Sequence, residues 1–236
     1  MLTKQESGVT PILNPGYGLL LEQQKRPDLP WSTVPSILER EEFQDNVLGL
    51  EWNFLRTPRY HWYEIEDGKL KIELRPETVT ELVNPSYVAQ RTRDVSYSAT
   101  TQLSFHAKAA NEKAGLVIYR RHGNNYQLLK EPNNIVLIKT FQEGNKGEFE
   151  PEIVASAPYN NKDVIFSVKV TKLEAQFFYG ENEDNLKPMG DAQDYTLVSD
   201  EVAQRFNGVY VGMYATANGK KSKNAAEFNW FEYKGE

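Results

Sequence analysis

Apolar and polar residues alternate along most of this chain with a period of two, which is typical of β-strands that bury one face. The alternation from Val95 to His106 predicts a strand whose exposed side carries His106. The same alternation over Leu48–Phe54 predicts another strand, with its leucines and aromatic residues in the core. No stretch of useful length has the helical period. The sequence therefore predicts an all-β chain of about a dozen strands.

Residues 62–74 predict a β-hairpin that turns at Asp67-Gly68, a dipeptide typical of the type I′ turn. A two-residue loop pairs Glu66 with Lys69, Ile65 with Leu70, Glu64 with Lys71 and Tyr63 with Ile72. Every pair joins like with like or opposite charges. Glu64 and Glu66 could be read as an acid/base pair, but the lysines opposite them indicate a solvated structural face.

Residues 114–129 predict the central hairpin of the fold and its most promising site. A buried strand, Ala114–Tyr119, leads into a polar turn, Arg120–Asn125, and a second apolar run, Tyr126–Leu129. The turn offers hydrogen-bond donors beside two tyrosine rings, a composition suited to contacting a sugar. The candidate substrate-binding residues are Tyr119, Arg121, His122, Asn125 and Tyr126, with Arg120 and Asn124 beside them. The alternative is a solvated turn that binds nothing.

Residues 1–40 differ from the rest of the chain. Five prolines fall in this segment, and each removes a backbone donor and restricts its predecessor to extended geometry. We expect an extended connector packed on the surface of a β-domain that spans residues 41–236. The start of the chain lacks the apolar core of a signal peptide, and no apolar run approaches the ~20 residues of a membrane span.

Charge and residue content exclude several classes of function. A net charge of −6 argues against binding to a phosphate backbone, which requires clustered lysine and arginine. The chain contains no cysteine, and its three histidines lie far apart without the spacing of zinc ligands. The E-x-D-x-x-E signature of sandwich glycosidases is absent. We therefore assign no catalytic residue and no metal ligand.

Several motifs resemble the C-terminal β-sandwich of family 43 glycoside hydrolases, the β-xylosidases and α-L-arabinofuranosidases. The central hairpin is similar to the family's "AGL-x-x-Y, polar turn, Asn-x-Tyr". Residues 48–58 resemble "L-G-L-x-W-N-W-L-R-x-P", and the end of the chain resembles "F-T-G-x-x-V-G-L-Y-A … A-D-F-D-W-F-x-Y". Glu227 and Asn229 replace two aspartates of that closing motif.

The resemblance implies a concanavalin A-like (jelly-roll) β-sandwich of two antiparallel sheets without the catalytic domain. Such a domain would stabilise a five-bladed propeller partner and help to close a sugar site for xylose- or arabinose-containing glycans. Two alternatives stay open: a free carbohydrate-binding module for xylan-type glycans, and an independent sandwich-type glycosidase. Sandwiches of this kind can hold Ca²⁺ between the opening and closing strands, here with Glu41, Glu42, Asp45 and Glu227 as candidates. Glycan-degrading relatives are often exported, which favours the periplasm or the cell exterior.

Overall fold

The computed structural model describes residues 2–5, 8–11, 39–144 and 147–236. The chain divides into two compact units, Met1–Ile37 and Leu38–Glu236. In the first unit, strand β1 (Leu2–Gln5) pairs in antiparallel fashion with β2 (Gly8–Pro11). Most of the expected connector lies outside the described residues. Its packing on the domain therefore stays a prediction.

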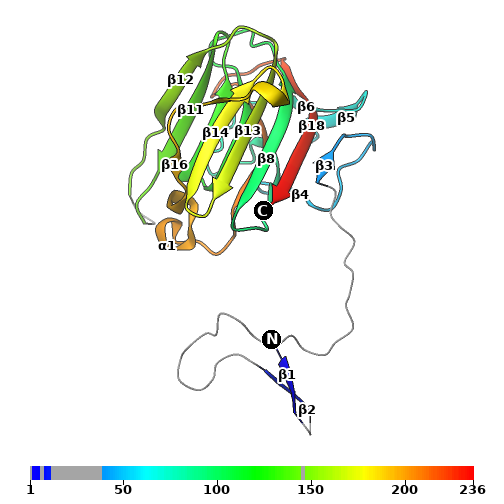
Figure 1. Cartoon of the computed structure of the whole chain (residues 1–236). Helices are drawn as coiled ribbons and strands as arrows, with labels where there is room; N and C mark the ends of the chain where they lie inside the picture. Colours follow the sequence, from blue (N-terminus) through cyan, green and yellow to red (C-terminus); the bar gives the residue numbers. More distant parts are fainter. Residues whose placement is uncertain (1, 6–7, 12–38, 145–146) are drawn as a thin grey trace. The chain divides into compact units, whose positions relative to one another are not determined.

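The second unit is a sandwich of two antiparallel sheets (Figure 1). The seven-stranded sheet has the order β12 (Glu152–Pro158), β11 (Asn134–Phe141), β10 (Asn124–Lys130), β9 (Lys113–Arg121), β17 (Tyr210–Thr216), β7 (Ser86–Arg91) and β4 (Trp52–Phe54). The other sheet has the order β15 (Lys187–Pro188), β14 (Glu174–Gly180), β13 (Asp163–Thr171), β8 (Tyr97–Ser104), β18 (Ala225–Gly235), β6 (Lys69–Glu73) and β5 (Tyr63–Glu66). Strand β16 (Gln193–Asp194) pairs with β14, and β3 (Arg40–Glu41) pairs with β18. The predicted all-β sandwich of two antiparallel sheets is confirmed.

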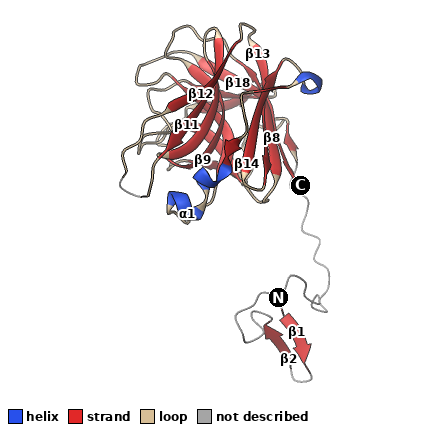
Figure 2. Cartoon of the chain, turned by 60° about the vertical axis from the view of Figure 1, so that its left-hand side comes forward, coloured by secondary structure: helices blue, strands red, loops and turns tan. Residues whose placement is uncertain are grey.

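Helical structure in the described residues is confined to short turns, which Figure 2 shows in blue. They are the 3₁₀ turns η1 (Glu183–Asn185) and η2 (Tyr195–Val198) and the four-residue helix α1 (Asp200–Ala203). Among these described residues, no helix is long and apolar enough to cross a membrane. Helix α1 and η2 lie at one end of the sandwich, and this is the end where the central hairpin turns.

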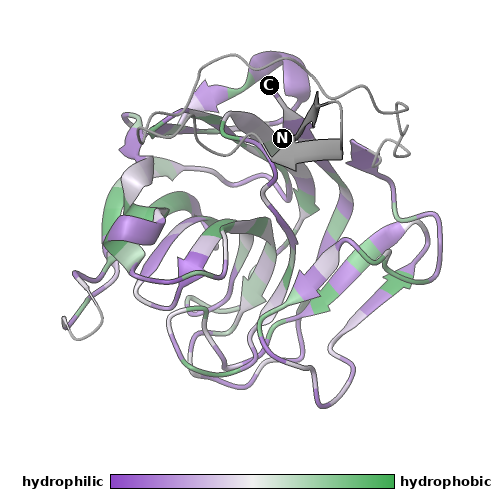
Figure 3. Ribbon diagram, turned by 90° about the horizontal axis from the view of Figure 1, so that it is seen from below, coloured by the Kyte–Doolittle hydropathy of each residue, from purple (hydrophilic) through white to green (hydrophobic). Residues whose placement is uncertain are grey.

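The main core lies between the two sheets, where the inward-facing residues of each strand interdigitate. In β8, Tyr97, Ala99, Thr101 and Leu103 are completely buried, while Ser98, Thr100 and Gln102 are partly exposed, as the alternation predicts. Strand β18 needs an irregularity to keep this pattern: its register against β8 shifts between Phe228 and Trp230. A bulge of this kind returns Phe231 and Tyr233 to the core. Figure 3 shows the resulting alternation of hydrophobic and hydrophilic residues along the strands.

A second apolar cluster covers the outer face of the seven-stranded sheet. Its members are Val79, Tyr87, Ala89, Val117, Tyr119, Leu129, Val136, Ile138 and Tyr214. Strands β9 and β10 are therefore buried on both faces along nearly their whole length. A strand buried on both faces reads as a continuous apolar run, as Ala114–Tyr119 does.

The predicted hairpin at residues 62–74 is confirmed in every pair, and Asp67 and Gly68 both adopt positive φ, as a type I′ turn requires. The predicted strand over Leu48–Phe54 is shorter than expected. A turn bond from Trp52 N to Gly49 O interrupts the alternation, so only Trp52–Phe54 forms a strand and Leu50 is fully exposed. Val95 is also exposed, because β8 begins two residues later.

Candidate functional site

The central hairpin ends in a much tighter turn than the sequence predicts. Strand β9 continues to Arg121 and β10 begins at Asn124, so only His122 and Gly123 form the turn. The expected six-residue polar tip is wrong, because most of it belongs to the two strands. Four of its residues are almost completely buried: Arg120 at 3% exposure, Arg121 at 4%, and Asn124 and Asn125 at 0%. The tip is therefore not a solvated turn, and sugar binding by these residues stays a prediction.

Hydrogen bonds within the protein explain how so many polar groups can be buried here. Arg121 Nε donates to Asn124 Oδ1 at 2.6 Å, and another nitrogen of Arg121 donates to the carbonyl oxygen of Gly144. Asn124 Nδ2 donates to Leu197 O at 3.0 Å, which joins the hairpin to turn η2. Buried polar groups are stable only when they are paired in this way. The tip is thus held by two segments that are remote in sequence.

A β-bulge at Arg120 changes the direction of the hairpin tip. Asn124 lies opposite Arg121 and Asn125 lies opposite Tyr119, so Arg120 has no partner across the ladder. A bulge leaves its extra residue unpaired and reorients the side chains around it. Arg120 forms an ion pair with Asp200 on α1, and its carbonyl oxygen accepts from Asn207 Nδ2 at 2.9 Å. The bulge therefore turns the tip towards the segment that follows α1.

A depression of about 430 Å³ lies where the hairpin tip meets this segment and the loops after β4 and β6. We call it the basic depression; its lining residues are Arg56, Leu82, Tyr119, Arg120, Arg121, His122, Arg205, Phe206 and Asn207. Three of the five predicted substrate-binding residues, Tyr119, Arg121 and His122, therefore lie together in one cavity.

The other two predicted residues do not reach the basic depression. Asn125 is fully buried, and its side chain donates to His122 O at 2.9 Å and accepts from Gln127 Nε2 at the same distance. Tyr126 points into the core, where its ring lies 5.7 Å from that of Phe177 and its hydroxyl donates to Asp194 O. Successive residues of a strand face opposite sides of the sheet, so neighbours in sequence separate here.

The basic depression concentrates positive charge on a chain whose net charge is −6. Its lining contains four arginines and a histidine and no carboxylate. The pKa of His122 is lowered below its usual value by burial first, and then by the charges of Arg121, Arg205 and Arg56. Burial, followed by the charge of Arg205, also lowers the pKa of Arg121. Burial is the larger cause of both shifts, and the neighbouring arginine charges act in the same direction.

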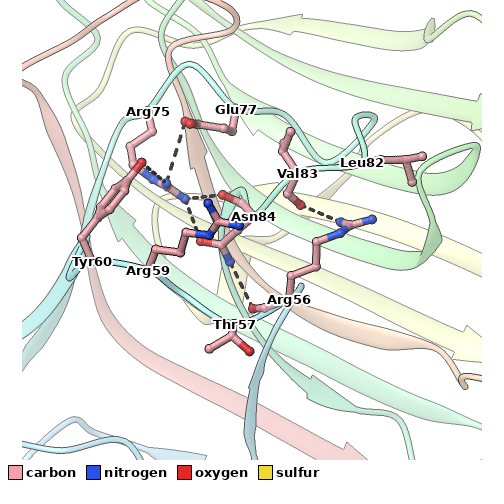
Figure 4. A pocket seen from close by; sticks show the side chains of 9 residues that line it. All are labelled: Arg56, Thr57, Arg59, Tyr60, Arg75, Glu77, Leu82, Val83 and Asn84. Atoms are coloured by element: carbon pink, nitrogen blue, oxygen red, sulfur yellow. Dashed lines mark hydrogen bonds and ion pairs between the residues drawn. The ribbon is translucent and has the colours of Figure 1, made fainter.

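A second depression of about 530 Å³ shares Arg56 and Leu82 with the first. Figure 4 shows the residues that line it. Its lining is held together by Arg75, which donates to Ser86 Oγ at 2.9 Å and to the carbonyl oxygen of Asn84. The guanidinium of Arg75 also lies 5.0 Å from the ring of Trp62, close enough for a cation–π contact. Because these contacts join several loops, we interpret Arg75 as structural.

Sequence reasoning missed Arg56, Leu82, Arg205, Phe206 and Asn207 as part of the site. Phe206 offered one signal: it is a lone aromatic residue in a polar stretch, and the structure leaves it 95% exposed. The remaining residues come from three separate segments of the chain. Their convergence depends on the order of the strands, which no local pattern reveals.

Carboxylates are not paired in the cavities that we describe. Each of the four best-defined depressions on the described surface contains at most one Asp or Glu. The described residues contain no cluster of His, Asp or Glu that could hold a metal ion. Two of the calcium candidates have other partners: Glu41 accepts from Phe43 N at 2.7 Å, and Glu227 lies 3.4 Å from Lys69 Nζ. The calcium expectation gains no support from this geometry.

The fold and its cavities define an antiparallel concanavalin A-like sandwich with a basic depression at one end. Residues 40–234 match the family described as the beta xylosidase C-terminal concanavalin A-like domain. The chain belongs to this family, and the predicted resemblance is confirmed. It corresponds to the C-terminal domain of family 43 xylosidases and arabinofuranosidases.

Similar proteins are longer enzymes that contain this domain as one part. The non-reducing end alpha-L-arabinofuranosidase BoGH43B of Bacteroides ovatus is 28% identical over 222 residues, which cover 92% of this chain and 41% of the enzyme. A xylosidase/arabinosidase of Butyrivibrio fibrisolvens is 25% identical, over 94% of this chain and 43% of its own length. A solved structure from Bacteroides ovatus, titled "Xyloglucan PUL GH43B", superposes with a TM-score of 0.82 at 25% identity and covers 100% of this chain and 46% of its own. The chain spans less than half the length of these relatives.

Proposed function

We propose that this chain serves as the accessory, non-catalytic sandwich of a β-xylosidase- or arabinofuranosidase-like glycoside hydrolase. It packs against a five-bladed propeller that carries the catalytic residues, stabilises it, and helps to close its site for xylose- or arabinose-containing glycans. One observation carries the proposal: the family match covers nearly the whole sandwich, yet the chain spans only 41% of a matching arabinofuranosidase. Because such glycans are polymers found outside cells, we also propose a periplasmic or extracellular location.

The surface around the basic depression supports this function. Phe206 is 95% exposed and Leu82 is 67% exposed, and both lie in its lining. Tyr60, at 60% exposure, belongs to the adjoining depression. These apolar side chains lie in two adjoining depressions beside several arginines, and aromatic residues and arginine are enriched in protein interfaces. We place the contact with the propeller and its sugar at this end of the sandwich.

Two observations weaken the alternative functions. A free carbohydrate-binding module needs exposed aromatic rings on a sheet face, but Tyr87, Tyr119 and Tyr214 on the outer face of the seven-stranded sheet are buried. An independent glycosidase needs two carboxylates that flank one bond. The four depressions described above do not provide such a pair.

A chimeric enzyme tests the proposal. The full 236-residue chain is joined to the catalytic part of the Bacteroides ovatus arabinofuranosidase in place of that enzyme's own C-terminal domain. We expect the chimera to hydrolyse an aryl arabinofuranoside and to unfold at a higher temperature than the catalytic part alone. The separate 236-residue chain should show no hydrolysis. Equal stability and activity without the chain would refute the accessory function, as would hydrolysis by the chain itself.

A pair of variants in the chimera locates the contact. Phe206→Ala should lower kcat/KM by about tenfold, or about 1.4 kcal/mol, if its ring closes the sugar site. Leu173→Ala is the matched control, because Leu173 is 62% exposed in the turn between β13 and β14 of the other sheet. Equal effects of the two variants would place the contact elsewhere on the sandwich.

A further inference from the structure

Only part of the positive charge of the basic depression is paired with an acidic group in the described part of the sandwich. Arg120 has an ion-pair partner, Asp200. In the part of the chain that the structure describes, Arg56 and Arg205 form no ion pair. Arg56 donates to Val83 O at 2.6 Å, and Arg205 reaches the carbonyl oxygen of Gln204 at 3.5 Å. Both guanidinium groups therefore keep their full charge and several free donor directions.

Buried groups at the base of the depression add to this imbalance. The Nε of Arg120 is buried and has no hydrogen-bond acceptor among the described residues. Beside it, the side chain of Arg121 is 4% exposed, and burial first and then the charge of Arg205 lower its pKa. A positive charge that is removed from water and surrounded by other cations is costly unless an anion approaches it. The site thus favours a negatively charged ligand.

The depression also has the size and composition of a sugar site. Its volume of about 430 Å³ falls in the range of small-ligand pockets. The exposed ring of Phe206 can contact the apolar face of a pyranose, and the neighbouring Asn207 has an amide that can bond to hydroxyl groups. Arginine pairs with a carboxylate through two parallel hydrogen bonds, which gives orientation as well as attraction.

We propose that the basic depression binds the carboxylate of a uronic acid carried by the glycan, with Arg56 and Arg205 as the principal contacts. This inference rests on the proposed function and refines its substrate class, from neutral xylose- or arabinose-containing glycans to those with acidic branches. The ring of Phe206 lies against the same sugar. The walls of the depression come from this chain, so binding does not require the propeller.

Calorimetric titration of the full chain with a matched pair of ligands tests the inference. One ligand is a xylo-oligosaccharide with a single glucuronic acid branch, and the other is the same molecule with its carboxyl group reduced to the alcohol. We expect the acidic ligand to bind at least about tenfold more tightly, and the difference to shrink at high salt. Equal binding of the two ligands, or no binding of the acidic one, would overturn the inference.

Two variants and one further probe sharpen the result. Arg205→Gln should remove most of the preference for the acidic ligand while leaving the fold intact, because Arg205 receives the bond from Arg120 through its backbone oxygen. Lys221→Gln removes the same charge from an exposed turn and should change nothing. A short oligoglutamate peptide that binds as tightly as the acidic sugar would overturn the inference and indicate an acidic protein surface as the partner. A functional chimera with no preference for the acidic sugar would leave the accessory function standing and refute the uronic acid site alone.

Discussion

The two hairpins β5–β6 and β9–β10 both turn through two residues, but the first tip is exposed to solvent and the second is buried. Each reverses direction through two residues, Asp67-Gly68 in the first and His122-Gly123 in the second. In the first hairpin the charged side chains face water, and Lys71 pairs with Glu64 at 2.6 Å. In the second, polar residues on both sides of the turn are buried. A two-residue turn that ends in glycine therefore does not determine whether the residues around it are exposed.

The position of each hairpin in its sheet explains the difference. Strand β5 is the last strand of its sheet, so one side of the first hairpin meets only solvent. Strands β9 and β10 lie in the middle of the seven-stranded sheet, and their tip is covered by the carbonyl groups of Gln142, Gly144 and Leu197. Charged and amide groups at such a covered tip form hydrogen bonds that link separate segments of the chain. The same groups at an edge mainly keep the protein soluble.

Replacing Asn124 by Ala should produce the largest loss of stability, because it removes hydrogen bonds that hold the covered tip. The change leaves Arg121 Nε without its acceptor at 2.6 Å and Leu197 O without its donor at 3.0 Å. Leaving buried polar groups unpaired costs about 1–3 kcal/mol, more for charged ones, so we expect a loss of about 2–3 kcal/mol in the free energy of unfolding. Urea denaturation followed by tryptophan fluorescence measures this loss.

The matched control for Asn124→Ala is Lys71→Gln in the edge hairpin. Lys71 and Glu64 both keep more than a third of their side-chain surface in water, and an exposed ion pair contributes about 0–1 kcal/mol. We expect a loss below about 0.5 kcal/mol. If the two variants lost similar amounts of stability, the contrast between a covered tip and an exposed one would be wrong.

Gly68→Ala should have an intermediate effect, because it strains the turn of the exposed hairpin without disturbing a core. Gly68 has a φ of +68°, in the left-handed region, where a residue with a Cβ atom costs roughly 1–2 kcal/mol. We expect a loss of about 1 kcal/mol by urea denaturation. Gly68→Asn should recover most of it, since Asn tolerates this conformation. Full stability of the alanine variant would show that the turn is not held in the type I′ form.

The fold was predictable because strand pairing here follows local rules. Alternation located β8, the Asp67-Gly68 turn set the register of β5 and β6, and the closing motif located β17 and β18. The alternation failed at Leu50, where a single backbone bond from Trp52 N to Gly49 O forms a turn. A periodic sequence cannot show whether a turn interrupts the strand.

The candidate site was only partly predictable because it depends on contacts between distant segments. Composition alone singled out the residues of the hairpin tip, and three of these line the basic depression. The alternation along the strand could have predicted that Tyr126 points away from the basic depression. It could not have predicted the bulge at Arg120. Arg56 and Arg205 reach the same cavity from segments 149 positions apart in sequence. Only the sheet order β9-β17-β7-β4 brings them together.

The titration of His122 gives the smallest expected effect and reports directly on the covered tip. Burial and the charges of Arg121, Arg205 and Arg56 lower the pKa of His122 in the folded protein below its usual 6.5. A lowered histidine pKa means that the folded state prefers the neutral ring. This contribution to stability is therefore complete above about pH 6.5 and is lost as the pH falls towards the folded pKa.

Nuclear magnetic resonance of the imidazole protons over pH 4–8 measures this pKa. Arg205→Gln should move it back towards the usual value, because Arg205 supplies part of the repulsion. Lys221→Gln, in a remote exposed turn, should leave it unchanged. A His122 pKa at or above 6.5 in the unmodified chain would show that the positive potential of the basic depression is neutralised. The hairpin tip would then resemble the solvated turn of β5 and β6, and the contrast between the two hairpins would be one of packing alone.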